Sequence, residues 1–227
     1  MYSNRWLVAA AAAGQTLASA AASAENVLRW TSQGDALTLD PMSQNEGPTN
    51  SMNGQIYESL VTRDADLKLQ PELAVSWTSA DDGWTFKLRQ GVTFHDGAAF
   101  TAEDVAFSIA RAQSESSDFK EQVKAITGVE IIDEYTVKLK TDGPNPILPN
   151  QLTSTYILDK GWAEANNVLE PQDFKAKEET CAVRNANGTG PFKVVSRAPD
   201  ELTVLERNKA WWGDKEFPGN IDRIEYR

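Results

Sequence analysis

The segment from residue 69 to residue 111 constrains the fold more than any other part of the sequence. An Asp-Gly turn at positions 82 and 83 is followed by apolar residues that alternate with polar ones, namely Trp84, Phe86 and Leu88. This pattern predicts a β-hairpin with one buried face. Thr101 then precedes a helical apolar pattern, with Asp104 three positions later, which is typical of a capped helix start.

Other stretches of the sequence mix strand and helix patterns without strict alternation. Hairpins are predicted at 129–140 and at 192–207, because apolar and polar residues alternate there around turn residues. We expect a strand at 27–31, a helix at 51–60 and a mixed, mainly helical stretch at 145–166. The final residues, 221–227, again have a strand-like pattern. The chain is therefore predicted to have a mixed α/β fold.

Three sequence motifs resemble the signature of a known family. They are PELAVSW at 71–77, GWTFKLRQGVTFHDG at 83–97 and TAEDVAFSIAR at 101–111. They are similar to extracellular solute-binding protein family 5, the periplasmic receptors of peptide, opine and nickel ABC importers. Further matching stretches are LTLDP at 37–41, NGTGPF at 187–192 and WWG at 211–213.

The resemblance implies a type II periplasmic-binding-protein fold. Residues 25–62 and 190–227 would form parts of the first lobe, and residues 63–189 would form the extra domain of the peptide-binding subgroup. The second lobe is expected to be absent from these residues, so the chain would be an N-terminal fragment or a truncated product. Because such receptors close two lobes around the solute, one lobe would offer half a site.

The implied function is that of a binding protein. It would capture a peptide or similar small polar solute in the periplasm and deliver it to an ABC permease, as a monomer without cofactor or chemistry. Two alternatives stay open at this point: a one-lobe product with no transport role, and a periplasmic hydrolase on a related scaffold.

The first 24 residues resemble a secretory signal peptide. Arg5 is followed by an apolar run at 6–13 and by small residues that end in Ala22-Ser23-Ala24. This order predicts export and cleavage before Glu25. A membrane anchor is the alternative, but the run falls short of the ~20 apolar residues that a membrane span needs.

The charge balance argues against a nucleic-acid partner. The chain has 22 lysine and arginine residues against 33 aspartate and glutamate residues, a net charge of -11. Such an acidic chain is poorly suited to binding nucleic acid.

The single cysteine, Cys181, cannot form an internal disulfide. It is either a plain small side chain or the partner of a cysteine in a missing portion.

No catalytic or metal site is predicted. The only histidine, His95, has no second histidine with which to bind a metal, and no Gly-x-Ser-x-Gly nucleophile motif occurs. The stretch 188–190, Gly-Thr-Gly, lacks the Lys-Ser/Thr of a phosphate-binding loop. The resemblance assigns it to a tight connection near the cleft. The pair Trp211 and Trp212 could stack on a ligand, but we favour a packing role.

Candidate solute-binding residues follow the first predicted strand and lie in and around the first predicted helix. Polar loop side chains at such positions commonly face a cleft. The hydrogen-bonding candidates are Ser32, Gln33, Gln44, Asn45 and Asn53. The candidates for aromatic walls are Tyr57 and Tyr156. The alternative for each is an ordinary solvated loop residue or a tyrosine of the core.

Overall fold

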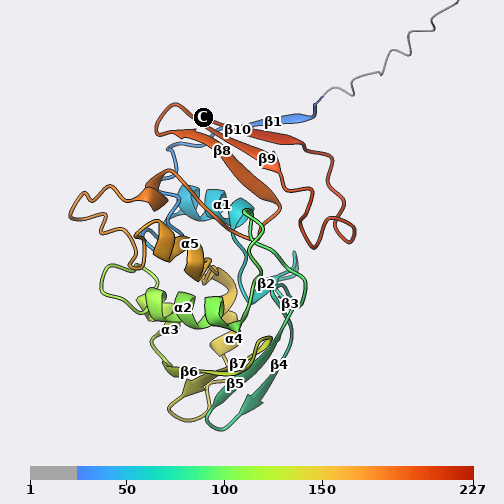
Figure 1. Cartoon of the computed structure of the whole chain (residues 1–227), viewed down its shortest axis with the longest axis vertical. Coiled ribbons are helices and arrows are strands. Elements are labelled where there is room, and N and C mark those ends of the chain that lie inside the picture. The colour runs from blue at the N-terminus through green and yellow to red at the C-terminus, as the bar shows by residue number, and fades with distance from the viewer. Residues whose placement is uncertain (1–24) are drawn as a thin grey trace, which may run out of the picture.

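A computed structural model describes residues 25–227 of the chain. A four-stranded sheet lies at each end of an elongated body, and most of the helices lie between the two sheets (Figure 1). The structure thus confirms the predicted mixture of strands and helices. The predicted signal peptide, residues 1–24, lies outside the described residues.

The first sheet joins the beginning of the described chain to its end. Its order is β1-β10-β9-β8, with the bounds Val27–Trp30, Arg223–Tyr226, Leu202–Arg207 and Phe192–Ala198. The first strand runs parallel to β10, and the other neighbours are antiparallel. The predicted strand at 27–31 and the predicted hairpin at 192–207 are therefore confirmed.

Helix α1, Gly47–Ile56, contacts β8 below this sheet (Figure 1). The prediction of a helix at 51–60 was wrong at both ends. The helix begins earlier because the Glu46 side chain accepts a hydrogen bond from the Thr49 amide at 2.8 Å and caps the first turn. It ends at Ile56 because Tyr57 has extended backbone angles, so Leu60 lies outside it.

The second sheet is built from two hairpins and is antiparallel throughout. Its order is β4-β5-β7-β6, with the bounds Ala74–Ala80, Gly83–Leu88, Thr136–Thr141 and Ile126–Asp133. Gly83 is required at the first turn, since its φ is +142° and a Cβ there would lie 2.1 Å from the Leu139 carbonyl oxygen. Both predicted hairpins are confirmed.

Helix α2, Ala102–Ala112, packs against β6 and β7. Thr101 and Asp104 form the predicted capping box, in which Asp104 accepts from the Thr101 amide at 2.8 Å. Val105 and Ile109 from the helix pack with Phe86 in the larger core cluster. The capping residues therefore fix where the helix begins over this sheet.

A short hairpin and a one-turn helix were not predicted. Strands β2, Val61–Arg63, and β3, Leu69–Pro71, pair as a small antiparallel hairpin. Its turn is closed by Asp64, which accepts hydrogen bonds from the amides of residues 66 and 68. A one-turn helix, α3 at Lys120–Val123, follows α2.

The stretch predicted as mainly helical at 145–166 contains only short pieces. These are α4 at Leu148–Gln151, the 3-10 turn η1 at Leu152–Ser154, and α5 at Lys160–Ala165, which Asp159 caps. A second 3-10 turn, η2, covers Cys181–Val183. The smaller core cluster combines side chains from this stretch with the first sheet and α1, including Leu158, Ala163, Val168, Leu205 and Ile56. The division into residues 25–62 with 190–227 and residues 63–189 stays a prediction.

Candidate functional site

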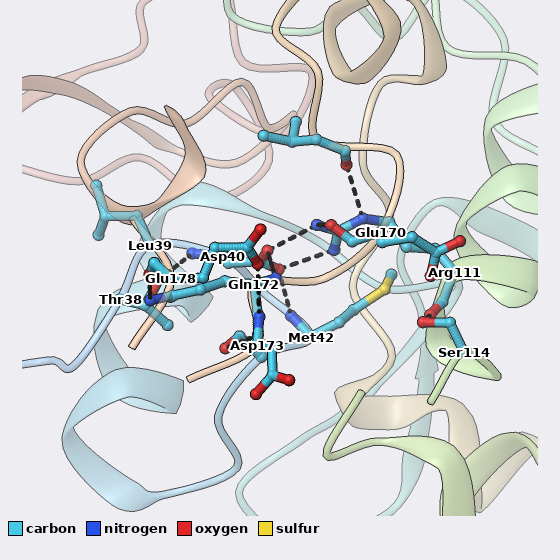
Figure 2. A network of polar contacts seen from close by, with 12 residues as sticks. Thr38, Leu39, Asp40, Met42, Arg111, Ser114, Glu170, Gln172, Asp173 and Glu178 are labelled. Carbon is cyan, nitrogen blue, oxygen red and sulfur yellow. Dashed lines mark hydrogen bonds and ion pairs between the residues drawn. The ribbon is translucent and has the colours of Figure 1, made fainter. Parts of the chain in front are cut away.

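A buried ion pair connects the loop after β1 with helix α2. Both terminal nitrogens of Arg111 bind the Asp40 carboxylate, at 2.8 Å and 2.6 Å (Figure 2). Both side chains are fully buried. Because the contact is bidentate, it fixes the relative orientation of the two side chains as well as pairing their charges.

The remaining polar atoms of this pair are also satisfied. Arg111 donates to the backbone carbonyls of Val168 and Glu170, at 3.1 Å and 3.0 Å. Asp40 accepts from the backbone amides of Met42 and Gln172, at 3.1 Å and 2.9 Å (Figure 2). Burying two charges is favourable only when such partners compensate their lost hydration. The network therefore holds together the loop 38–42, helix α2 and the segment 168–172.

A polar pocket of about 510 Å³ lies next to this network and is lined mainly by the residues that follow each of the three segments, at 43–44, 115–120 and 170–175. Its size is in the usual range for small-molecule sites. It brings together four carboxylates and two ammonium groups. The charged residues that line it are Glu115, Asp118, Glu170, Asp173, Lys120 and Lys175. A pocket with both signs of charge can pair with a solute that carries both an amino and a carboxyl group.

One of the seven predicted solute residues lines this pocket. Gln44 donates to the Asp118 carboxylate at 3.3 Å. Its neighbour Ser43, which sequence reasoning missed, donates to the backbone carbonyl of Gln172 at 2.8 Å. Asn45 is exposed and accepts from the Asn50 side chain at 2.8 Å.

Ser32 and Gln33 line a different, smaller pocket of about 140 Å³ beyond the end of β1. Ser32 is hydrogen-bonded to the Gly34 carbonyl at 2.6 Å and shares a short contact with the Tyr226 hydroxyl. This pocket also contains Asp35 and the turn between β8 and β9. The structure therefore places these two residues apart from Gln44.

Asn53 and Tyr57 are buried at α1, and Tyr156 is half-buried beside them. Tyr57 donates to the Leu39 carbonyl at 3.2 Å, and burial, followed by the charge of Asp40, raises its pKa above the ordinary value. Tyr156 donates to the Asn50 carbonyl at 3.3 Å, and its ring centre lies 6.2 Å from that of Tyr57. Asn53 donates to the Asp40 carbonyl at 3.5 Å, so it contacts the loop that carries the ion pair.

His95 joins the turn after β5 to the connection at 187–190. Its Nε2 lies 3.0 Å from the Gly190 carbonyl oxygen, and burial lowers its pKa to about 4. Gly188 lies so close to α1 that a Cβ would come within 2.1 Å of the Ile56 carbonyl oxygen. Among residues 25–227, no group of three or more histidine, cysteine or acidic side chains could hold a metal ion.

Comparison with known proteins assigns the family. Residues 68–227 match the profile of bacterial extracellular solute-binding proteins, family 5, middle region. The chain belongs to this family. The match confirms the resemblance noted in the sequence and the prediction of a solute-binding protein rather than an enzyme. No helix within residues 25–227 is long and apolar enough to cross a membrane.

The relatives of this family 5 chain are named for glutathione and peptides. It is 35% identical to the glutathione-binding protein GsiB of Escherichia coli over 97% of its own length and 41% of that protein. It is 29% identical to the periplasmic oligopeptide-binding protein OppA of Haemophilus influenzae over 79% of its length and 36% of that protein. The chain thus spans about two fifths of the length of these relatives.

A solved structure shows the same architecture. The periplasmic binding protein DppA of Helicobacter pylori, in complex with the peptide STSA, superimposes with a TM-score of 0.73 at 28% identity. The superposition covers 89% of this chain and 42% of DppA. The described residues therefore have the fold of the corresponding part of a family 5 binding protein.

Proposed function

We propose that the whole protein is the periplasmic receptor of an ABC importer and that it captures a peptide-like solute for the permease. The observation that carries this proposal is the family 5 match together with the mixed-charge pocket on the Asp40–Arg111 network. The ligands for which the relatives are named, glutathione and peptides, support the class of solute. The receptor would act as a monomer and perform no chemistry.

Within this receptor, the mixed-charge pocket would provide part of the solute site. Asp118 and Asp173 can pair with the amino group of a peptide, and Lys120 and Lys175 can pair with its carboxylate. Gln44 would add a hydrogen bond from the loop after β1. Ser32 and Gln33 would contact a more distant part of a longer solute, since they lie in the separate pocket near Tyr226.

Calorimetric titration of the protein isolated from its natural source tests this proposal. Reduced glutathione and a panel of dipeptides and tripeptides serve as ligands. We expect saturable binding, weakened at least tenfold by Asp173→Asn and by Lys120→Met. Lys209→Met, an exposed residue outside the pocket, is the matched control and should bind normally. Absence of binding across the whole panel would rule out a peptide-like solute.

A further inference from the structure

A second pocket, of about 650 Å³, lies between the hairpin β2–β3 and the segment that follows β9. It shares no lining residue with the mixed-charge pocket. One wall is aromatic and consists of Trp211, Trp212 and Phe217. The adjacent indole rings are 5.5 Å apart, and Phe217 lies 6.2 Å from Trp211.

Glu58 fixes the two indoles of this wall. Its Oε1 accepts from the Nε1 of Trp211 at 2.9 Å, and its Oε2 accepts from the Nε1 of Trp212 at 2.9 Å. Trp212 also packs against the larger core cluster, which agrees with the predicted packing role. Because their polar edges are held by one buried carboxylate, the rings form a rigid wall.

Glu72 lies beside Glu58 and has an unused oxygen. Its Oε2 accepts from the amide and the hydroxyl of Ser59, both at 2.9 Å. Within residues 25–227, its Oε1 accepts no hydrogen bond. Burial, and then the neighbouring charge of Glu58, raise the pKa of Glu72 to about 8. At neutral pH the Glu72 carboxyl is therefore mostly protonated.

The pocket carries more negative than positive groups. Its lining contains four carboxyl groups, from Glu58, Asp64, Glu72 and Glu216, against the two guanidinium groups of Arg63 and Arg89. Arg89 donates its Nε to the Glu72 backbone carbonyl at 3.0 Å and lies 3.7 Å above the Trp212 ring. Among residues 25–227, neither Glu58 nor Glu72 forms an ion pair with a cationic side chain.

We propose that this pocket binds an organic cation, a primary ammonium group on an aromatic or aliphatic body, with Glu72 as the anchoring residue. The ammonium group would bind the unused Oε1 and form a direct ion pair, which neither carboxyl has within residues 25–227. The body of the ligand would lie against the aromatic wall, whose ring faces attract cations. The pocket volume of about 650 Å³ suits a ligand of this size.

Binding of such a cation must release a proton, because it favours the ionised form of Glu72. Between about pH 6 and pH 8 the affinity should therefore rise by up to tenfold for each pH unit. Among the groups that face Glu72, Glu58 raises its pKa and the hydrogen bonds of Ser59 lower it. Tyr156 is also near, since the charge of Glu72 helps to raise the pKa of that tyrosine. Arg89 lowers the pKa of Glu58, and Asp64 and Glu216 lie at the same pocket.

The test uses calorimetric titration of the full chain with benzylammonium, and with benzyl alcohol and benzoate as neutral and anionic ligands of the same shape. We expect only benzylammonium to bind, with close to one proton released at pH 7 as judged from two buffers of different ionisation enthalpy. Glu72→Gln, which can still accept from Ser59, should weaken binding at least tenfold. Asp173→Asn, in the mixed-charge pocket, should leave it unchanged.

Three results would overturn the proposal. Equal binding of benzyl alcohol would mean that the pocket is only an apolar groove. Unchanged affinity in Glu72→Gln would mean that the cation is bound elsewhere. An affinity in the wild type that does not vary between pH 6 and pH 8 would exclude Glu72 as the anchor, and this measurement is independent of how well the variant folds.

Discussion

Replacement of Arg111 by methionine should destabilise the protein strongly. The variant keeps the apolar part of the side chain but leaves Asp40 as a fully buried carboxylate without its cation. It also removes the donors to the carbonyls of Val168 and Glu170. Loss of one partner from a buried ion pair costs about 3–5 kcal/mol. Since 1.4 kcal/mol corresponds to a factor of ten, the ratio of folded to unfolded protein should fall by about 10²–10³ or more.

Urea denaturation, followed by circular dichroism and extrapolated to water, measures this change. Arg29→Met is the matched control, because Arg29 also pairs with a carboxylate, that of Glu225, but its side chain is 71% exposed. The control should lose less than about 1 kcal/mol. Asp40→Asn combined with Arg111→Met should cost less than the sum of the two single changes. Equal losses in Arg111→Met and Arg29→Met would refute the reasoning.

Three further changes test the elements around the sites. Between about pH 6.5 and pH 4, His95 is protonated in the unfolded chain but not in the folded chain. The free energy of unfolding should therefore decrease by about 3 kcal/mol when the pH is lowered over this range. The decrease should be smaller in His95→Asn. Thr101→Ala should cost about 1 kcal/mol in chemical denaturation, because the cap of α2 is lost. Gly188→Ala should cost about 1–3 kcal/mol or more through its clash with Ile56, whereas Gly128→Ala, in open space, should be tolerated.

Each of these three expectations can fail clearly. The same acid-induced loss of stability in His95→Asn and the wild type would show that His95 does not cause it. Unfolding of Thr101→Ala at the wild-type urea concentration would show that the cap does not stabilise α2. Equal melting temperatures of Gly188→Ala and Gly128→Ala would show that the close approach to Ile56 does not require glycine.

The local elements could be predicted from the sequence because their signals lie within a few residues. The hairpin at β4 and β5 follows from alternation around Gly83, and the start of α2 follows from Thr101 and Asp104. The start of α1 was missed because Glu46 is not a typical capping residue. Strands β2 and β3 were missed because three residues are too short for a period-two pattern.

The two pockets were harder to predict, because they depend on contacts between distant parts of the chain. Asp40 and Arg111 lie in the family motifs at 37–41 and 101–111, but 71 positions separate them and no local pattern joins them. Gln44 was found because it follows the first strand. The acidic and basic residues at 115–120 and 170–175 were not predicted as site residues, since surface charges in loops give no periodic signal. Glu58 contacts Trp211 and Trp212 across 153 and 154 positions of the sequence.

The parallel pairing of β1 with β10 has a consequence for the order of folding. Contacts such as that between the Asn26 amide and the Asp222 carboxylate close a loop of 196 residues, whereas β4 to β7 all lie between residues 74 and 141. Closing a long loop is entropically costly and slow. Because a chain is synthesised from its N-terminus, β1 must stay unpaired until β10 has been synthesised. During that interval the first strand is an open edge that another chain or a chaperone can occupy.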